Sequence, residues 1–193
     1  VYPVPVCVPQ TAGKVFCIYS SDDGAYGTPY YGDSWNGSAW AGQESVTTIF
    51  SAHTQFGLVQ DGDAVHMAFE DVPNKKIYYR KRSAAGSWGT EIELTSGANA
   101  ANWVPTITLI ASDHVRIYWA SSSVLKYRDI TAGSLGPLMS YSEATDTLSS
   151  GLAVQVTPSG ATPLLVYTTK AASPFDVVAL RQNAAGTLFW SMP

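Results

Sequence analysis

Apolar side chains alternate with other residues in short segments that recur at nearly constant intervals along the chain. The clearest examples share one apolar face and end in an aromatic residue; they are Lys14–Tyr19, Ala64–Phe69, His114–Trp119 and Thr162–Tyr167. Their aromatic ends are 50, 50 and 48 residues apart. A period of two within a segment is typical of a β-strand, and a long fixed period between segments is typical of stacked sheet repeats. The pattern predicts four copies of one sheet-forming unit.

Each unit is predicted to contain four antiparallel strands, of which the segment above is the second. An apolar first strand precedes it across a turn containing Gly or Asp, and a third strand follows it. The first strands are expected at Pro5–Val8, Phe56–Val59, Pro105–Thr108 and Leu152–Gln155. The third strands are expected at Tyr30–Tyr31, Ile77–Tyr79, Leu125–Tyr127 and Val177–Leu180, and fourth strands after turns at Gly37, Gly86, Gly133 and Gly186.

These units predict an all-β fold, a β-propeller built of four-stranded antiparallel blades. The whole chain, 1–193, is then a single domain with blades at about 1–48, 49–98, 99–147 and 148–193. Because neighbouring blades must cover the faces of each blade, we expect the four to close into a ring. A fragment of a ring with five to seven blades, and a larger ring completed by self-association, are the alternatives.

Composition narrows the classes of function. Only 13% of the residues are charged and the formal net charge is -4, so nucleic acid is not an expected partner. No apolar run approaches the roughly 20 residues of a membrane span. The start at Val1 is expected of a processed mature chain or an excised segment.

Cys7 and Cys17 are the only cysteines, and they lie at equal distances from Ala12 on either side of a predicted turn. They therefore face each other if the two segments pair as a hairpin. A cross-strand disulfide in an oxidising compartment and a pair of buried free thiols both fit this pattern.

Two groups of propellers resemble this sequence. Asp61–Glu70, which runs into Lys76–Arg80 and Gly86–Trp88, resembles the repeat of sialidase-like secreted propellers. Val115–Trp119 resembles the second blade strand of fucose-binding propeller lectins. The resemblance implies a secreted protein and, more weakly, a function in carbohydrate recognition.

The lectin resemblance implies a sugar pocket with an Arg on the second strand and a Glu on the third. Arg116 matches the Arg, whereas the third strand of its unit offers Lys126 and Tyr127 and no Glu. We therefore expect at most one pocket of that kind.

Aromatic rings and arginines are the predicted ligand-binding groups, since flat rings beside polar groups suit sugars. Trp35 and Trp103 interrupt the repeat and are ligand candidates, whereas Trp40 and Trp88 are expected to pack between blades. The full set of predicted ligand-binding residues is Arg116, Arg128, Trp35, Trp103, Tyr31, Tyr79 and Tyr127.

No catalytic residue, metal ligand or cofactor is predicted, because the three histidines are dispersed and no nucleophile or phosphate motif occurs. The leading hypothesis is a secreted, lectin-like propeller that binds a glycan or glycoconjugate. One alternative is a carbohydrate-active enzyme of the sialidase or polysaccharide-lyase type. Another is a structural or adhesive propeller that binds proteins, including copies of itself as a homo-oligomer.

Overall fold

The structure is a computed structural model. It describes residues 5–20, 29–47, 49, 56–95, 102–121, 124–141, 153–156, 163–168, 177–182 and 189–191. Their regular structure is β-strand throughout, apart from one 3-10 turn at Thr11–Gly13. The fold is therefore all-β, as predicted.

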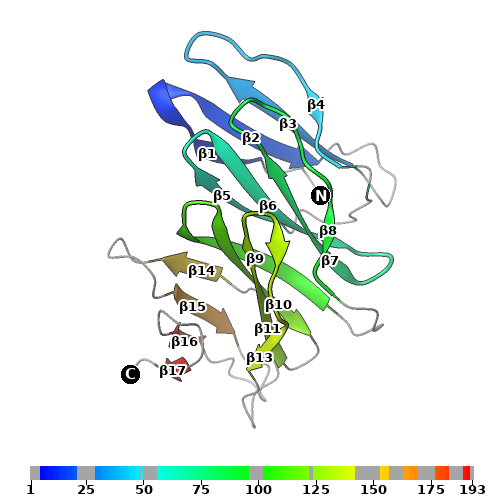
Figure 1. Ribbon diagram of the computed structural model, residues 1–193, viewed down its shortest axis with the longest axis vertical. Coiled ribbons are helices and arrows are strands. Elements are labelled where there is room, and N and C mark those ends of the chain that lie inside the picture. Colours follow the sequence, from blue (N-terminus) through cyan, green and yellow to red (C-terminus); the bar gives the residue numbers. More distant parts are fainter. Residues whose placement is uncertain are drawn as a thin grey trace.

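The described strands form four antiparallel sheets that follow one another along the chain (Figure 1). Sheet 1 contains β1 (Val6–Pro9), β2 (Val15–Ser20), β3 (Tyr30–Trp35) and β4 (Glu44–Ser45). Sheet 2 contains β5 (Phe56–Asp61), β6 (Ala64–Asp71), β7 (Lys76–Arg82) and β8 (Ile92–Glu93). Sheet 3 contains β9 (Asn102–Ala111), β10 (His114–Ser121) and β11 (Val124–Thr131), with β12 (Ser134–Leu135) and β13 (Met139–Tyr141) both paired to β11. Sheet 4 contains β14 (Ala153–Val156), β15 (Pro163–Thr168), β16 (Val177–Gln182) and β17 (Phe189–Ser191).

Alternation along the second strand of each sheet decides which neighbouring sheet a side chain meets. Phe16 and Ile18 of β2 share a buried cluster with Val65, Met67 and Phe69 of β6. The intervening residues of β6 point the other way, and Ala68 packs in a second cluster with residues of β10. Burial of a side chain as large as Ile18, Met67 or Phe69 stabilises the folded state by about 1.5–3 kcal/mol. Both faces of sheet 2 are thus covered by its neighbours.

Hydrogen bonds between hairpin turns add a polar connection between the sheets. The turn between β5 and β6 carries two aspartates, and each bonds to a different neighbour. Asp63 Oδ1 accepts from Thr11 N (2.7 Å) and Thr11 Oγ1 (2.6 Å) of sheet 1. Asp61 Oδ2 accepts from Asp113 N (2.7 Å) of sheet 3. One turn therefore fixes the position of sheet 2 against both adjacent sheets.

The four sheets do not close into a ring. β1 contacts β5, β5 contacts β9 and β9 contacts β14, so the first strands of successive sheets are neighbours. In the described part of the chain β14 makes no comparable contact with β1, and Figure 1 places sheets 1 and 4 at opposite ends of the row. The expected closure of four blades within one chain is therefore wrong, because the two end sheets do not meet in the described part of the chain.

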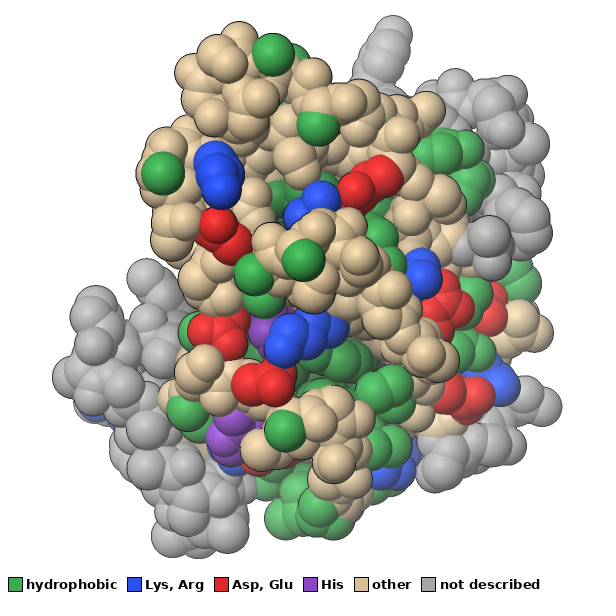
Figure 2. Space-filling model, turned by 45° about the horizontal axis from the view of Figure 1, so that its top comes forward, with side chains coloured by type: hydrophobic (Ala, Val, Ile, Leu, Met, Phe, Trp, Pro, Cys, Tyr) green, Lys and Arg blue, Asp and Glu red, His purple; other side chains and the backbone are tan. Residues whose placement is uncertain are grey.

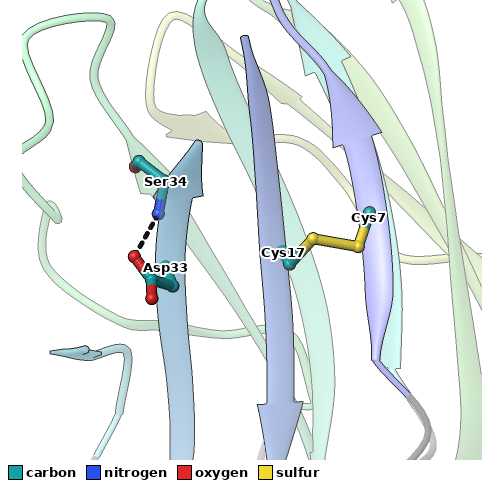
Figure 3. Close-up of a disulfide and its surroundings, with 4 residues drawn as sticks. All are labelled: Cys7, Cys17, Asp33 and Ser34. Carbon is teal, nitrogen blue, oxygen red and sulfur yellow. Dashed lines mark hydrogen bonds between the residues drawn. A yellow bond between two sulfur atoms is a disulfide. The ribbon is translucent and has the colours of Figure 1, made fainter. Parts of the chain in front are cut away.

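A disulfide joins the first two strands of sheet 1 (Figure 3). Cys7 and Cys17 are directly opposite each other in the register of β1 and β2, and their sulfur atoms are 2.06 Å apart. Of the two alternatives that the sequence left open, the structure has the disulfide.

We expect the double variant Cys7→Ser, Cys17→Ser to lose about 2–3 kcal/mol of unfolding free energy, because the bridge restricts the unfolded chain. Urea denaturation of both proteins measures this loss. Reduced wild-type protein is the matched control and should unfold at the same urea concentration as the variant. A variant as stable as the oxidised wild type would contradict the structural role of the bridge.

Candidate functional site

One face of sheet 1 has no neighbouring sheet in the described structure, and aromatic side chains collect on it. Strand pairing sets Tyr19 opposite Tyr31, and Val15 opposite Trp35. Trp40 forms an isolated bridge with Trp35 and lies on the same side. We call this surface the open face; its members are Val15, Cys17, Tyr19, Tyr31, Asp33, Trp35 and Trp40.

The positions that correspond to Tyr19 in sheets 2 and 3 are fully buried. Phe69 and Trp119, which correspond to Tyr19 in the repeat, are both 0% exposed because the preceding sheet covers them. Tyr19 is only partly buried, and Trp40 is 52% exposed. The open face thus presents rings to solvent at a position where the other sheets pack theirs away.

The rings of the open face form two pairs at opposite ends of the surface. The Tyr19 and Tyr31 centroids are 6.4 Å apart, and the Trp35 and Trp40 centroids are 5.6 Å apart. Tyr31 and Trp35 are four residues apart on β3, which corresponds to about 13 Å along the strand. The two pairs can therefore contact an elongated ligand at two separated points.

Asp33 lies between the two aromatic pairs, opposite Cys17. Its Oδ1 accepts hydrogen bonds from Ser34 N (2.8 Å; Figure 3) and Gly42 N (2.9 Å), so the side chain is held in place. The residues that define the open face include no Lys or Arg. The surface therefore combines apolar rings, tyrosine hydroxyls and one carboxylate.

The two tryptophans expected to pack between sheets behave differently. Trp88 follows the prediction: its Nε1 donates to Glu44 (3.0 Å) and its ring lies 6.1 Å from that of Phe16, between sheets 2 and 1. Trp40 does not, because it belongs to the one sheet without a preceding neighbour in the described structure. Trp40 and Trp88 occupy the same position in the repeat, but only Trp88 has a preceding sheet to pack against in the described structure.

Arg116 lies in a buried polar cluster between sheets 3 and 4. Its Nε and Nη2 donate to the two oxygens of Asp129 (2.6 and 2.9 Å), and its Nη1 donates to Gln182 Oε1 (3.0 Å) of β16. Tyr118 also donates to Gln182, and the Tyr127 ring centre lies 5.3 Å from the guanidinium carbon. Three of the nitrogen donors of Arg116 are thus occupied by partners within the protein.

The electrostatics of this cluster favour the charged pair. Burial alone would lower the pKa of Arg116, but the hydrogen bonds with Asp129 more than offset it and raise that pKa. Burial alone would raise the pKa of Asp129, and the same guanidinium lowers it below its ordinary value. Both groups therefore stay ionised at neutral pH.

The carboxylate of this cluster is the residue that sequence reasoning missed. The sequence analysis compared Arg116 only with Lys126 and Tyr127 of the third strand. Asp129 lies two residues further along β11 and pairs directly with Arg116. Ser121 pairs with Val124, and counting along the antiparallel strands from this pair places Asp129 opposite Arg116.

The remaining predicted residues lie apart from each other. Tyr79 is buried, and its hydroxyl is hydrogen-bonded to His66 Nδ1 (2.7 Å). Arg128 Nη1 donates to Gly136 O (2.9 Å) in the following turn. Trp103 lies on β9, and its side chain is outside the described residues.

Two pairs of predicted residues share a surface or a cluster. Tyr31 and Trp35 share the open face, and Arg116 and Tyr127 share the buried cluster. A ligand-binding role for each of them stays a prediction. Trp40 was missed as a ligand candidate because its repeated position indicated packing.

Charged side chains elsewhere are paired rather than gathered by sign. The basic stretch in β7 illustrates this, because its cations meet carboxylates on neighbouring elements: Lys76 meets Glu93 (2.8 Å), Arg80 meets Glu91 (3.5 Å), Lys81 meets Asp113 (2.6 Å) and Arg82 meets Glu44 (2.7 Å). Figure 2 shows basic and acidic side chains side by side on the face in view.

Among the described residues, no group of three or more His, Cys, Asp or Glu side chains is arranged to hold a metal ion. No helix there is long and apolar enough to cross a membrane.

Known structures resemble this fold at low sequence identity. An α-L-arabinofuranosidase from Clostridium thermocellum superposes with a TM-score of 0.60 at 10% identity, over 98% of this chain and 71% of its own. The hydrazine synthase of Kuenenia stuttgartiensis gives 0.66 at 14% identity, over 100% and 54%. A polysaccharide lyase acting on ulvan, bound to a GlcA(1-4)Rha3S unit, gives 0.61 at 10% identity, over 97% and 56%.

These similarities define the class of fold. The carbohydrate-active neighbours are of the propeller type, so the chain is propeller-like, without a specific tie to sialidase-like propellers or fucose-binding lectins. The chain spans 54% of the synthase and 56% of the lyase. No family model and no curated protein matches the sequence.

His66 provides a test of the packing between sheets 2 and 3. Its ring is fully buried, and within the described structure its Nε2 has no hydrogen-bond partner. Burial, aided by nearby Lys81, lowers the pKa of His66 to about 4. The folded protein therefore holds this histidine neutral, whereas the unfolded chain binds a proton below an ordinary pKa of about 6.5.

We expect the unfolding free energy to fall as the pH decreases from about 6.5 to about 4, by up to about 3 kcal/mol from this group. Urea denaturation at several pH values measures the slope. His66→Phe should flatten it in this window, whereas His114→Gln, at a partly exposed histidine, should leave the His66 contribution intact. An identical slope in wild type and His66→Phe would contradict the assignment.

The Arg116 cluster provides a test of the contact between sheets 3 and 4. We expect Arg116→Met to destabilise the protein by about 2–3 kcal/mol, because it removes the buried cation that is paired with Asp129 and the donor that Asp129 and Gln182 share. The double variant Arg116→Met, Asp129→Leu should recover part of the loss. Chemical denaturation of the two variants measures both effects, and equal stability of Arg116→Met and wild type would contradict the role of this cluster.

Proposed function

We propose that this chain is a secreted, lectin-like propeller domain that binds carbohydrate through its open face. The observation that carries the proposal is the contact between Trp35 and Trp40 on a face that no neighbouring sheet covers in the described structure, where Trp40 is 52% exposed and Trp35 is partly exposed. Sugars offer apolar C–H surfaces that stack on such rings and hydroxyls that bond to nearby polar groups. Asp33 and the hydroxyl of Tyr31 supply those polar groups.

The structural neighbours support a glycan as the partner. Arabinofuranosidases and an ulvan lyase share the fold of this chain, and their names describe enzymes that act on arabinofuranosides and on a polysaccharide. The identities are too low to transfer a substrate, so the neighbours support the class of ligand and the open face supplies the site. Arg116, Arg128, Tyr79 and Tyr127 are not needed in this proposal.

The disulfide supports the proposed location outside the cell. Bridges such as Cys7–Cys17 persist in oxidising compartments and are rare in reducing ones. We further infer that sheets 1 to 4 are propeller blades with boundaries at about 1–48, 49–98, 99–147 and 148–193, as predicted from the repeat.

A glycan-degrading activity is the second candidate, and the enzyme names of the neighbours favour it. Incubation of the chain with arabinose-substituted xylan and with ulvan tests it. Release of free arabinose, or of unsaturated ends that absorb in the ultraviolet, would establish an enzyme. Binding without release of either product would favour the lectin-like function.

We expect the intact chain to bind at least one class of glycan on an array, and Trp40→Ala to weaken that binding by about tenfold, equivalent to about 1.4 kcal/mol. Titration calorimetry with the strongest glycan measures the change. Leu138→Ala, at an exposed apolar residue between β12 and β13, is the matched control and should bind as wild type. An array without any bound glycan would reject the proposal.

A further inference from the structure

The spacing of the aromatic pairs limits the length of ligand that can use the whole open face. Tyr19 and Tyr31 lie at one end and Trp35 and Trp40 at the other. The intervening distance along β3 is about 13 Å. A single sugar ring that stacks on one pair cannot reach the other, so only a chain of several linked sugars engages both.

The middle of the open face differs in charge from the same position in the other sheets. Asp33 is opposite Cys17, whereas the corresponding residues opposite Met67 and Ile117 are Arg80 and Arg128. All three residues bond to the backbone of the following turn, but with reversed polarity. The arginines donate to the carbonyls of Gly89 and Gly136, and Asp33 accepts from Gly42 N.

This carboxylate argues against another apolar sheet as the occupant of the face. Among the residues of the open face no cation is present to neutralise Asp33. Burial of a carboxylate that has no counter-ion under a packed apolar sheet is costly, whereas a ligand that carries hydroxyl groups can donate further hydrogen bonds to it. A hydrated polar chain therefore suits the surface better than a second protein sheet does.

The same carboxylate selects among glycans. A uronate or sulfate group lying about 4 Å from Asp33 would be repelled by about 1 kcal/mol even at the dielectric constant of water. Neutral sugars meet no such repulsion, and their hydroxyls can donate to the carboxylate. The open face therefore discriminates by charge as well as by length.

From these observations we propose that the open face binds an internal stretch of a neutral, linear polysaccharide that lies along β3 and contacts both aromatic pairs. The inference rests on the proposed carbohydrate-binding function and specifies its ligand. It excludes recognition of a single terminal sugar and of acidic or sulfated chains as the main mode of binding.

Calorimetric titration with neutral β-1,4-linked oligosaccharides, from the monosaccharide to the hexasaccharide, tests the length requirement. We expect the affinity to rise by about tenfold or more until both pairs are engaged, and then to level off. Tyr31→Ala and Trp35→Ala should each remove most of this gain, while their circular dichroism spectra and melting temperatures show whether they fold. A monosaccharide that binds as tightly as the hexasaccharide would overturn the inference but leave the carbohydrate-binding function standing.

Asp33→Asn tests the charge requirement. The asparagine Oδ1 can still accept from Ser34 N and Gly42 N, so the turn is kept and only the charge is lost. We expect binding of a uronate- or sulfate-bearing oligosaccharide to strengthen by about threefold or more, with little change for the neutral chain. Wild-type protein that prefers the acidic chain would overturn the inference. Failure to bind any sugar would instead reject the proposed function itself.

Discussion

Each sheet in this protein has two faces, and the structure follows from which of them a neighbouring sheet covers. A sheet of four short strands is too thin to enclose a core of its own, so its side chains are buried between it and the next sheet. Phe16 and Ile18 of sheet 1 meet Met67 and Phe69 of sheet 2 in this way. Alternate residues of the same strand point to the opposite face, which a second sheet covers in the middle of the row. Stability is therefore shared between adjacent sheets, and the end sheets of the row are left with unequal surroundings.

The unequal surroundings of the sheets explain which polar and aromatic side chains are used in packing and which stay accessible. In the interior of the row, polar residues that enter the contacts between sheets are used to hold those sheets together. Arg116 and Gln182 are an example, since their polar groups bond to each other across the contact between sheets 3 and 4. On the open face of sheet 1 the same positions carry rings and a carboxylate that no adjacent sheet covers in the described part of the chain. A surface free of packing demands can bind a ligand without loosening the fold, and Trp35 and Trp40 lie on such a surface.

The strands could be predicted from the sequence because the side-chain period of two and the repeat near 50 residues are both local properties. The second strands ending in Tyr19 and Phe69 were confirmed for this reason, and the symmetrical placement of Cys7 and Cys17 about a turn set them opposite each other. Closure of the ring could not be predicted, because it depends on a rotation between successive sheets that no periodicity records. The exposure of Trp40 was missed for the same reason: its repeat position indicates packing only where a preceding sheet exists.

The repeat also shows why similarity of position does not imply similarity of role. Asp33, Arg80 and Arg128 occupy one repeated position on the third strand, and each bonds to the turn that follows. The geometry of that position is conserved between the sheets while its charge is reversed in sheet 1. A reader of the sequence who looks for repeated ligand residues would select the arginines, which serve the fold. The residue that departs from the repeat, Asp33, lies between the two aromatic pairs of the open face, so the surface proposed to bind carbohydrate is marked by departure from the repeat rather than by repetition.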